Sequence, residues 1–366
     1  MRIVCDISPL AVPPTGIGAY IRGVVSELPR IGPADEVVAL GVGTRAETLA
    51  MAGHLGYPTG VRLRLRALPR TRRIVNRIPL PLVEVLAGRT DAFLSSEWLY
   101  PRQRSGLRVA VVHDLVPLLH PEWTTAAIRR MHIAKLRDTR RSDVVVCNSR
   151  TTAEAVQREL GVPAGRIVVA APGVEDRFRR ATPAPPAVLD GRPYVVALAT
   201  REPRKNLGAL IDAFASVRRE LPELALVLVG GPGWGHDAVA EGIERNGLAS
   251  AVVETGYLAD DTVPGVLAGA RAFAFPSLFE GFGMPIVEAQ ACGVPVVAGS
   301  DPSLDEACGA GALRAAPTDA VAFASALVAA VADPAVRRTL IGAGRSHAAA
   351  LTWRATAATI RRAIGG

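Results

Sequence analysis

The chain has 366 residues and a formal net charge of +8 at pH 7, and 49% of its residues are hydrophobic. This length exceeds one ordinary domain and suits two, each with its own core. The four cysteines are scattered and fit neither a disulfide framework nor a zinc site. No uncharged apolar run reaches the roughly 18 residues of a membrane helix, and no signal peptide precedes the first expected strand, so we expect a cytoplasmic protein.

The positive charge comes almost entirely from arginine, because only Lys135 and Lys205 among the 42 cationic residues are lysine. A basic chain can bind nucleic acid, an anionic membrane surface or phosphorylated ligands. Helix-turn-helix, zinc-finger and RNP patterns are absent from the sequence, and only 5% of the residues are aromatic. Nucleic acid is therefore the least favoured of the three partners.

Short apolar strands alternate with helical stretches through residues 1–176, which we expect to form a first domain. Helices are expected at 19–28 and 126–141. The alternation predicts a parallel sheet covered on both faces. The strands are expected at 2–7, 36–40, 61–65, 91–94, 108–112, 144–147 and 166–169.

A proline-rich, polar stretch at 177–193 is predicted to be a linker to a second α/β domain at 194–350. A last helix is expected at 353–364, within a C-terminal segment 351–366. The second domain is expected to carry strands at 194–199, 225–230, 251–254, 272–275 and 294–298.

Two glycine patterns follow expected strands in the first half. Gly16 and Gly18 lie in a TGIGAY stretch before a helix, where a phosphate could approach the backbone. The stretch 41–46 fits the dinucleotide fingerprint G-x-G-x-x-A, but no Asp or Glu occurs between Glu47 and Glu84 to hold a ribose. We therefore do not expect NAD to bind.

The stretch 276–300, PSLFEGFGMPIVEAQACGVPVVAGS, follows the strand expected at 272–275 and predicts a glycine turn, a short helix and a second strand. Pro285 suits the first helical position and Gly293 the C′ position. The turn is expected to present unpaired N–H groups to an anion. Glu280 lies on the turn and Glu288 within the helix, so both carboxylates could face one ligand.

These stretches resemble the E-x7-E block and its companion motifs in a large family of retaining glycosyltransferases that includes bacterial mannosyltransferases and sucrose and glycogen synthases. The matching motifs occur in the family's order: TGIG, HDL, EPRKN, LVGGPGWG, GYL and PSLFEGFGMP. The resemblance, closest to the family 4 or group 1 mannosyltransferase-like branch, implies the GT-B fold. Two Rossmann-like, doubly wound domains would face each other across a cleft, and the C-terminal helix would return to the first domain.

The resemblance also implies roles for particular residues. His113, of the HDL tripeptide, would hydrogen-bond the donor sugar, while Arg204 and Lys205 would neutralise the leaving diphosphate. Glu280 would stabilise the cationic sugar. The resemblance implies catalytic roles for His113, Glu280, Lys205 and Arg204, and donor binding by Gly16, Gly18, Gly231, Tyr257, Phe282, Gly283, Met284 and Glu288.

Ala19 stands where the family often has arginine, and Arg22 could substitute for it. The second diphosphate cation could be Arg201 or Arg204. Asp114 is expected to orient its loop and Ser149 to cap a helix. No D-x-D pair accompanies the basic residues, so we expect no metal and no cofactor other than the nucleotide-sugar substrate, with GDP-mannose favoured.

Two other functions stay open at this point. One is a non-catalytic nucleotide-sugar-binding protein, and the other is a glycosyl phosphorylase, whose pyridoxal phosphate would need a lysine other than Lys205 in the second domain. The acceptor could be a lipid-linked saccharide, a polysaccharide or a small metabolite. The alternating arginines from Arg62 to Arg77 could contact the inner face of a membrane or protect a sheet edge.

Overall fold

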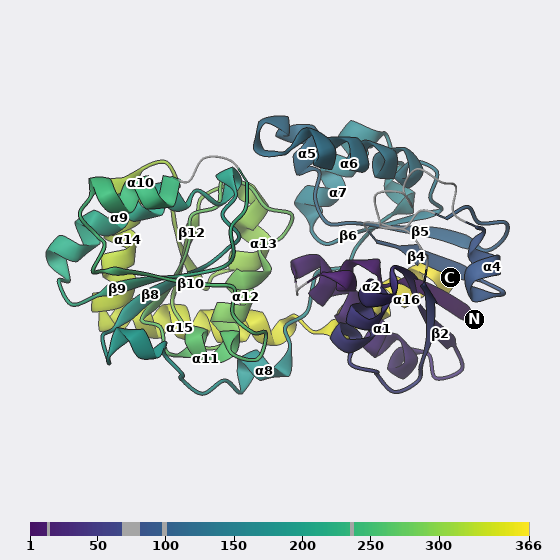
Figure 1. Ribbon diagram of the computed structural model, residues 1–366, viewed down its shortest axis with the longest axis horizontal. Coiled ribbons are helices and arrows are strands. Elements are labelled where there is room, and N and C mark those ends of the chain that lie inside the picture. Colours follow the sequence, from purple (N-terminus) through teal and green to yellow (C-terminus); the bar gives the residue numbers. More distant parts are fainter. Residues whose placement is uncertain (13–14, 68–80, 97–100, 235–237, 366) are drawn as a thin grey trace. The chain divides into compact units, whose positions relative to one another are not determined.

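A computed structural model describes the chain except for residues 13–14, 68–80, 97–100, 235–237 and 366. Contacts divide it into two units (Figure 1). Segment 177–193, predicted to be a linker, lies with unit 2. Arg70, Arg72, Arg73, Arg77 and Gly235, named in the sequence analysis or part of its motifs, lie outside the described residues. Unit 1 comprises Met1–Leu119, Ala126–Gly173 and Thr352–Gly366, and unit 2 comprises His120–Thr125 and Val174–Leu351.

Unit 1 is built on a seven-stranded parallel sheet with the order β3-β2-β1-β4-β5-β6-β7. Its strands are mostly apolar and buried, as expected for a parallel sheet with both faces covered. The strands are β1 (Arg2–Asp6), β2 (Glu36–Gly43), β3 (Val61–Ala67), β4 (Ala92–Ser95), β5 (Leu107–Val112), β6 (Val144–Cys147) and β7 (Ile167–Val169).

Several helices of unit 1, among them α1, α2 and α7, begin at residues whose side chains cap them. Thr44 and Glu47 form a capping box at α2, and the Ser149 hydroxyl accepts a hydrogen bond of 3.0 Å from the Thr152 N–H at α7, which confirms the predicted cap. These helices are α1 (Gly16–Ile31), α2 (Arg45–Leu55), α4 (Val83–Ala87), α5 (Val116–Leu119), α6 (Ala126–Thr139), α7 (Arg150–Leu160) and α16 (Trp353–Gly365).

Unit 2 repeats the topology with a six-stranded parallel sheet in the order β10-β9-β8-β11-β12-β13. Phe214, Phe323 and Leu327 are buried in a core formed by α9, α14 and one face of the sheet. The strands are β8 (Tyr194–Leu198), β9 (Ala225–Val229), β10 (Val252–Gly256), β11 (Ala272–Phe275), β12 (Val296–Gly299) and β13 (Ala312–Ala315).

Helices of unit 2 connect successive strands, and α12 packs on α15. No single helix among the described residues is long and apolar enough to cross a membrane, although the bent pair Ala320–Ala332 and Pro334–Gly365 passes that test by length and composition together. The helices are α8 (Asp176–Arg179), α9 (Leu207–Glu220), α10 (Ala238–Arg245), α11 (Val263–Ala268), α12 (Met284–Ala291), α13 (Asp305–Cys308), α14 (Ala320–Ala332) and α15 (Pro334–Ala350).

The last helix, α16, packs on α1 within unit 1. The indole of Trp353 lies edge-on to the Tyr20 ring, with 5.8 Å between ring centroids. A side chain at Gly23 would lie 2.2 Å from the same indole, so only glycine allows this approach. The Thr356 hydroxyl donates a 2.6 Å hydrogen bond to the Ala171 carbonyl. The C-terminal helix is thus an integral part of unit 1.

Two local expectations were wrong, and one strand was missed. Gly16 and Gly18 lie in the first turn of α1, not in a loop, because the Thr15 hydroxyl caps the helix by accepting from the Gly18 N–H at 3.2 Å. Strand β2 continues through Gly43, so the G-x-G pattern lies within the strand. Strand β13 was not predicted.

Both sheets change winding direction at their centres, between β1 and β4 in unit 1 and between β8 and β11 in unit 2. In open parallel sheets, ligands bind beyond the carboxyl ends of the strands at such a switch point. The segments that follow β8 and β11 are those that contain Arg204, Lys205 and Glu280. The fold therefore brings together two motifs that lie about 75 residues apart in the chain.

Candidate active site

At the switch point of unit 2, the segment after β8 contacts the segment after β11. The first contains a turn of 3-10 helix, Pro203–Lys205, and the second leads through Glu280 to α12. The Leu278 N–H donates a 2.8 Å hydrogen bond to the Arg204 carbonyl, which ties the two backbones together. The side chains of both segments consequently meet.

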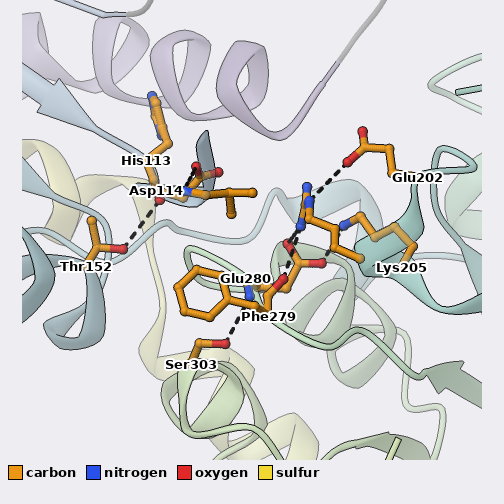
Figure 2. Close-up of polar contacts among 10 residues, drawn as sticks. His113, Asp114, Thr152, Glu202, Lys205, Phe279, Glu280 and Ser303 are labelled. Atoms are coloured by element: carbon orange, nitrogen blue, oxygen red, sulfur yellow. Dashed lines mark hydrogen bonds and ion pairs between the residues drawn. The ribbon is translucent and has the colours of Figure 1, made fainter. Parts of the chain in front are cut away.

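The carboxylate of Glu280 holds both cations of the EPRKN motif. Lys205 Nζ lies 2.5 Å from Glu280 Oε1, and Arg204 Nη1 lies 2.5 Å from Glu280 Oε2 (Figure 2). Arg204 Nε also contacts Glu202 Oε2 at 3.0 Å. The four side chains are between 9% and 16% exposed, so they form a buried cluster of two positive and two negative charges.

Burial and mutual attraction pull the pKa values of this cluster in opposite directions. Burial raises the pKa of Glu280, but the charges of Arg204 and Lys205 outweigh it and lower that pKa to about 2. Burial, helped by Arg204, lowers the pKa of Lys205, although Glu280 opposes the shift. Burial also raises the pKa of Glu202. Glu280 is therefore firmly anionic at neutral pH.

The position of Glu280 depends on a residue that the sequence analysis missed. The Glu280 N–H donates a 2.9 Å hydrogen bond to the Ser303 hydroxyl, and the Ser303 N–H donates to Asp301 at 2.9 Å. The expectation that the N–H groups of this turn are unpaired was therefore wrong at Glu280. Ser303 lies in a short 3-10 helix after β12, where no motif singled it out.

The helix after the turn, α12, begins and ends as its sequence predicted to within one residue. Gly283 adopts a φ of 99° just before it, a conformation that favours glycine, and Pro285 is the second rather than the first helical residue. Gly293, with a φ of 76°, follows its end. The Val294 N–H donates to the Ala289 carbonyl at 3.0 Å, completing a Schellman motif. Glu288 lies in this helix, as expected.

The other predicted donor-binding residues of unit 2 lie in varied surroundings. Phe282 is buried and Met284 is the first residue of α12, whereas Tyr257 is 53% exposed after β10. A side chain at Gly231 would meet nothing within 4 Å. Arg201, one of the two cations left open by the sequence, forms an ion pair with Glu254. Arg204, the other, contacts the Glu280 carboxylate together with Lys205.

In unit 1, His113 follows the end of β5 and is 7% exposed. Burial, with the charges of Lys135 and His132, keeps the pKa of His113 well below its usual value, so the ring is neutral. Its ring lies edge-on to Tyr20, with 5.1 Å between centroids. In the part of the chain that the structure describes, His113 Nε2 has no hydrogen-bond partner.

The loop around His113 is held by local hydrogen bonds. The Asp114 carboxylate accepts from the Val116 N–H at 3.0 Å, which confirms that it orients the loop, and the Thr152 hydroxyl donates to the His113 carbonyl at 3.5 Å (Figure 2). Within the described residues, no group of three or more His, Cys, Asp or Glu side chains is placed to hold a metal ion. The geometry thus offers a charged cluster in unit 2 and a neutral, oriented imidazole in unit 1.

Known proteins match this chain along most of its length. Residues 14–178 match the family described as Glycosyltransferase Family 4, and residues 192–333 match Glycosyl transferases group 1. O-antigen chain mannosyltransferase B of Escherichia coli is 27% identical over 373 residues, which cover 96% of this chain and 96% of that protein.

A GDP-mannose-dependent alpha-(1-6)-phosphatidylinositol monomannoside mannosyltransferase of Mycobacterium tuberculosis is 34% identical over 194 residues, 49% of each chain. The crystal structure of HepE from Anabaena in complex with UDP-glucose has the same fold, with a TM-score of 0.72 and 20% identity over 99% of this chain and 98% of that one.

The fold and the site therefore define a glycosyltransferase with two Rossmann-like domains of the GT-B type. The chain belongs to the family of group 1, or family 4, glycosyltransferases, in its mannosyltransferase-like branch. An enzyme of this class transfers a sugar from a nucleotide sugar to an acceptor.

Proposed function

We propose that this enzyme transfers mannose from GDP-mannose to an acceptor hydroxyl with retention of the anomeric configuration. The observation that carries the proposal is the cluster of Arg204, Lys205 and Glu280 at the switch point of the unit 2 sheet. The choice of donor follows the names of the relatives, among them the O-antigen chain mannosyltransferase B and the GDP-mannose-dependent mannosyltransferase.

The proposed role of the cluster is to accept the charge that develops on the departing diphosphate. Cations that are already in position stabilise such charge without reorganising during the reaction. Arg204 and Lys205 are held by Glu280 and Glu202, so their positions are set before the donor binds. The Glu280 carboxylate, still ionised at any physiological pH, would favour the cationic sugar that forms as the bond breaks.

His113 is proposed to bind a hydroxyl of the sugar. A buried polar atom without a partner costs roughly 1–3 kcal/mol, and a hydrogen bond from a ligand would remove that cost. Nε2 of His113 is such an atom. The neutral ring can offer this nitrogen as donor or acceptor, depending on the tautomer.

In this proposal the departing phosphate receives the acceptor's proton, so no protein base is needed, and the reaction needs no metal. Activity should then persist in excess chelator. Loss of activity in chelator that manganese restores would refute metal independence and leave the sugar transfer itself standing.

The test of the function is an assay with a panel of nucleotide sugars and a mannan oligosaccharide as acceptor. We expect GDP-mannose to give the highest kcat/KM and NMR of the product to show the α-anomer. A higher kcat/KM with UDP-glucose would refute the donor, and a β-product would refute retention. Donor binding without turnover of any tested acceptor and without hydrolysis would favour the non-catalytic alternative.

We also propose that the acceptor is a lipid-linked saccharide, a polysaccharide or a small metabolite. The proposed location is the cytoplasm, where the enzyme could contact the inner face of a membrane. In the described part of the arginine stretch, two exposed side chains contact other residues of the same chain. Arg62 pairs with Glu36 at 2.5 Å, and Arg66 donates to the Leu86 carbonyl at 3.0 Å. These contacts on the edge strand β3 fit the alternative role of edge protection.

A further inference from the structure

A cavity in unit 1 is lined by cations that the proposed sugar transfer does not use. It measures about 660 Å³ and lies beside β4, β5 and the C-terminal end of α6. Four arginines line it: Arg102, Arg104, Arg108 and Arg141. His113 does not line it, so the cavity is separate from the imidazole described above.

The floor of this cavity is apolar and its cations stand exposed. Phe93 on β4 is paired in register with Arg108 on β5, and paired residues of a parallel sheet point to the same face. Phe93 is buried, whereas all four arginines are exposed. The cavity therefore combines an apolar base with guanidinium groups that a solute can reach.

The described lining of the cavity contains fewer negative than positive side chains. Among the lining residues that the structure describes, Asp138 is the one carboxylate beside four guanidinium groups. Burial raises the pKa of Asp138, and the charges of Arg108 and Arg141 counter only part of the rise. Glu84 and Asp143 lie nearby, but they accept hydrogen bonds from the backbone N–H groups of Arg104 and Arg108 at 2.9 and 2.8 Å, and neither lines the cavity.

We propose that this cavity binds a phosphate ester, with the phosphate on the arginines and the rest of the molecule over Phe93. Guanidinium groups match the geometry of phosphate oxygens and pair with them bidentately. Arginine is common throughout this chain, so the convergence of four on one cavity carries the argument, not their identity. Cavities of roughly 300–1,000 Å³ hold small organic ligands, so a bare phosphate would leave most of this one unfilled.

Two sources of this chemistry are tested separately on the full-length chain. Glucose 6-phosphate and inorganic phosphate serve as soluble probes in titration calorimetry. Vesicles of phosphatidylglycerol, with phosphatidylcholine vesicles as reference, serve as lipid probes in flotation. The cavity variant is Arg102→Gln with Arg104→Gln. The matched control is Arg129→Gln with Arg130→Gln, which removes the same charge from exposed positions on α6.

We expect glucose 6-phosphate or phosphatidylglycerol to bind, glucose 6-phosphate more tightly than inorganic phosphate, and affinity to fall at least tenfold in the cavity variant but not in the control. Binding to glucose 6-phosphate alone assigns a free ester, and binding to vesicles alone assigns a lipid headgroup. Binding should persist in Lys205→Ala, which separates this site from the cluster in unit 2. No binding by the native chain, equal losses in both double variants, or a loss in Lys205→Ala alone would each overturn the proposal.

Discussion

The two units share one sheet topology, but the side chains that follow their central strands differ in charge. In unit 2, the segments after β8 and β11 interlock through charged side chains, with Glu280 between Arg204 and Lys205. In unit 1, the corresponding strands β1 and β4 meet through Asp6, which accepts hydrogen bonds from uncharged groups. The Ser8 N–H, the Ser8 hydroxyl and the Ser96 hydroxyl donate to it at 2.8, 2.9 and 2.7 Å.

This difference indicates which switch point can act on an anion. Asp6 is fully buried, and burial raises its pKa, so its partners serve to satisfy the carboxyl group itself. The unit 2 cluster instead contains two cations that a diphosphate could engage. A shared topology thus provides two equivalent places, and the residues at each decide what chemistry is available there.

The substitution with the largest expected effect on activity and stability is Glu280→Ala, which leaves Arg204 and Lys205 buried without their shared carboxylate. We expect kcat to fall by about 10²–10³-fold, as when other preorganised electrostatic contacts are removed. We also expect unfolding at lower denaturant, since breaking a buried pair costs about 3–5 kcal/mol. Steady-state kinetics and denaturant unfolding measure the two effects, and a native kcat would place the chemistry elsewhere.

Glu280→Gln keeps the shape of the side chain and tests the charge alone. Because the pKa of Glu280 is lowered from 4.5 to about 2, its stabilising effect is complete above pH 4.5 and is lost as the pH falls toward 2. The free energy of unfolding of the native chain should therefore decline more steeply over that window than that of the variant. Parallel slopes in denaturant unfolding at each pH would contradict the ionic cluster.

Lys205→Ala should have the next largest effect, with kcat/KM lowered about 100-fold. The Lys205 side chain is 12% exposed and its ammonium lies 5.2 Å from the centre of the Phe275 ring, and a planar guanidinium differs from this compact ammonium in shape and hydrogen-bond geometry. Lys205→Arg should accordingly recover only part of the loss. Arg245→Gln, at an exposed pair with Asp212, is the charge control and should leave kcat/KM unchanged.

In unit 1, where the imidazole of His113 is neutral, His113→Gln should lower kcat/KM about tenfold, within the lower range of losses for a single hydrogen bond. Since the pKa of His113 lies well below 6.5, the ring stays neutral as the pH falls from 8 to 6.5 and gains a proton only further down. The pH profile of kcat/KM should thus show no titration of His113 over that range. An acid limb near 6.5 that disappears in His113→Gln would show a charged imidazole.

The smallest effect is expected for Glu288→Ala, a few-fold rise in KM for the donor with less change in kcat. Glu288 is proposed to bind hydroxyls that do not change during transfer, so its contact contributes equally to the ground and transition states. Kinetics with varied donor separate the two parameters. A collapse of kcat at saturating donor would reverse the roles assigned to Glu280 and Glu288.

Apolar strands, capping residues and motif order were enough to predict two parallel sheets and the family. Strand β13 escaped prediction because ALRA is short, lacks β-branched residues and carries Arg314. The TGIG stretch was placed before the helix because its glycines could let a phosphate approach the backbone, whereas the Thr15 cap starts the helix at Gly16. The ion pairs of Glu280 with Arg204 and Lys205 could not be predicted, because they depend on which strands become neighbours in the sheet.

The docking of α16 on unit 1 bears on the order in which the chain can fold during synthesis. Val174 and Leu351, near the two ends of the main unit 2 segment, are joined by a 3.1 Å backbone hydrogen bond, so that segment is an insertion whose ends meet. Unit 1 needs Trp353 to cover Tyr20 and therefore stays incomplete until residues 352–365 leave the ribosome. The unit that is translated second can thus finish folding first, and deleting those last residues should impair the N-terminal half of the chain.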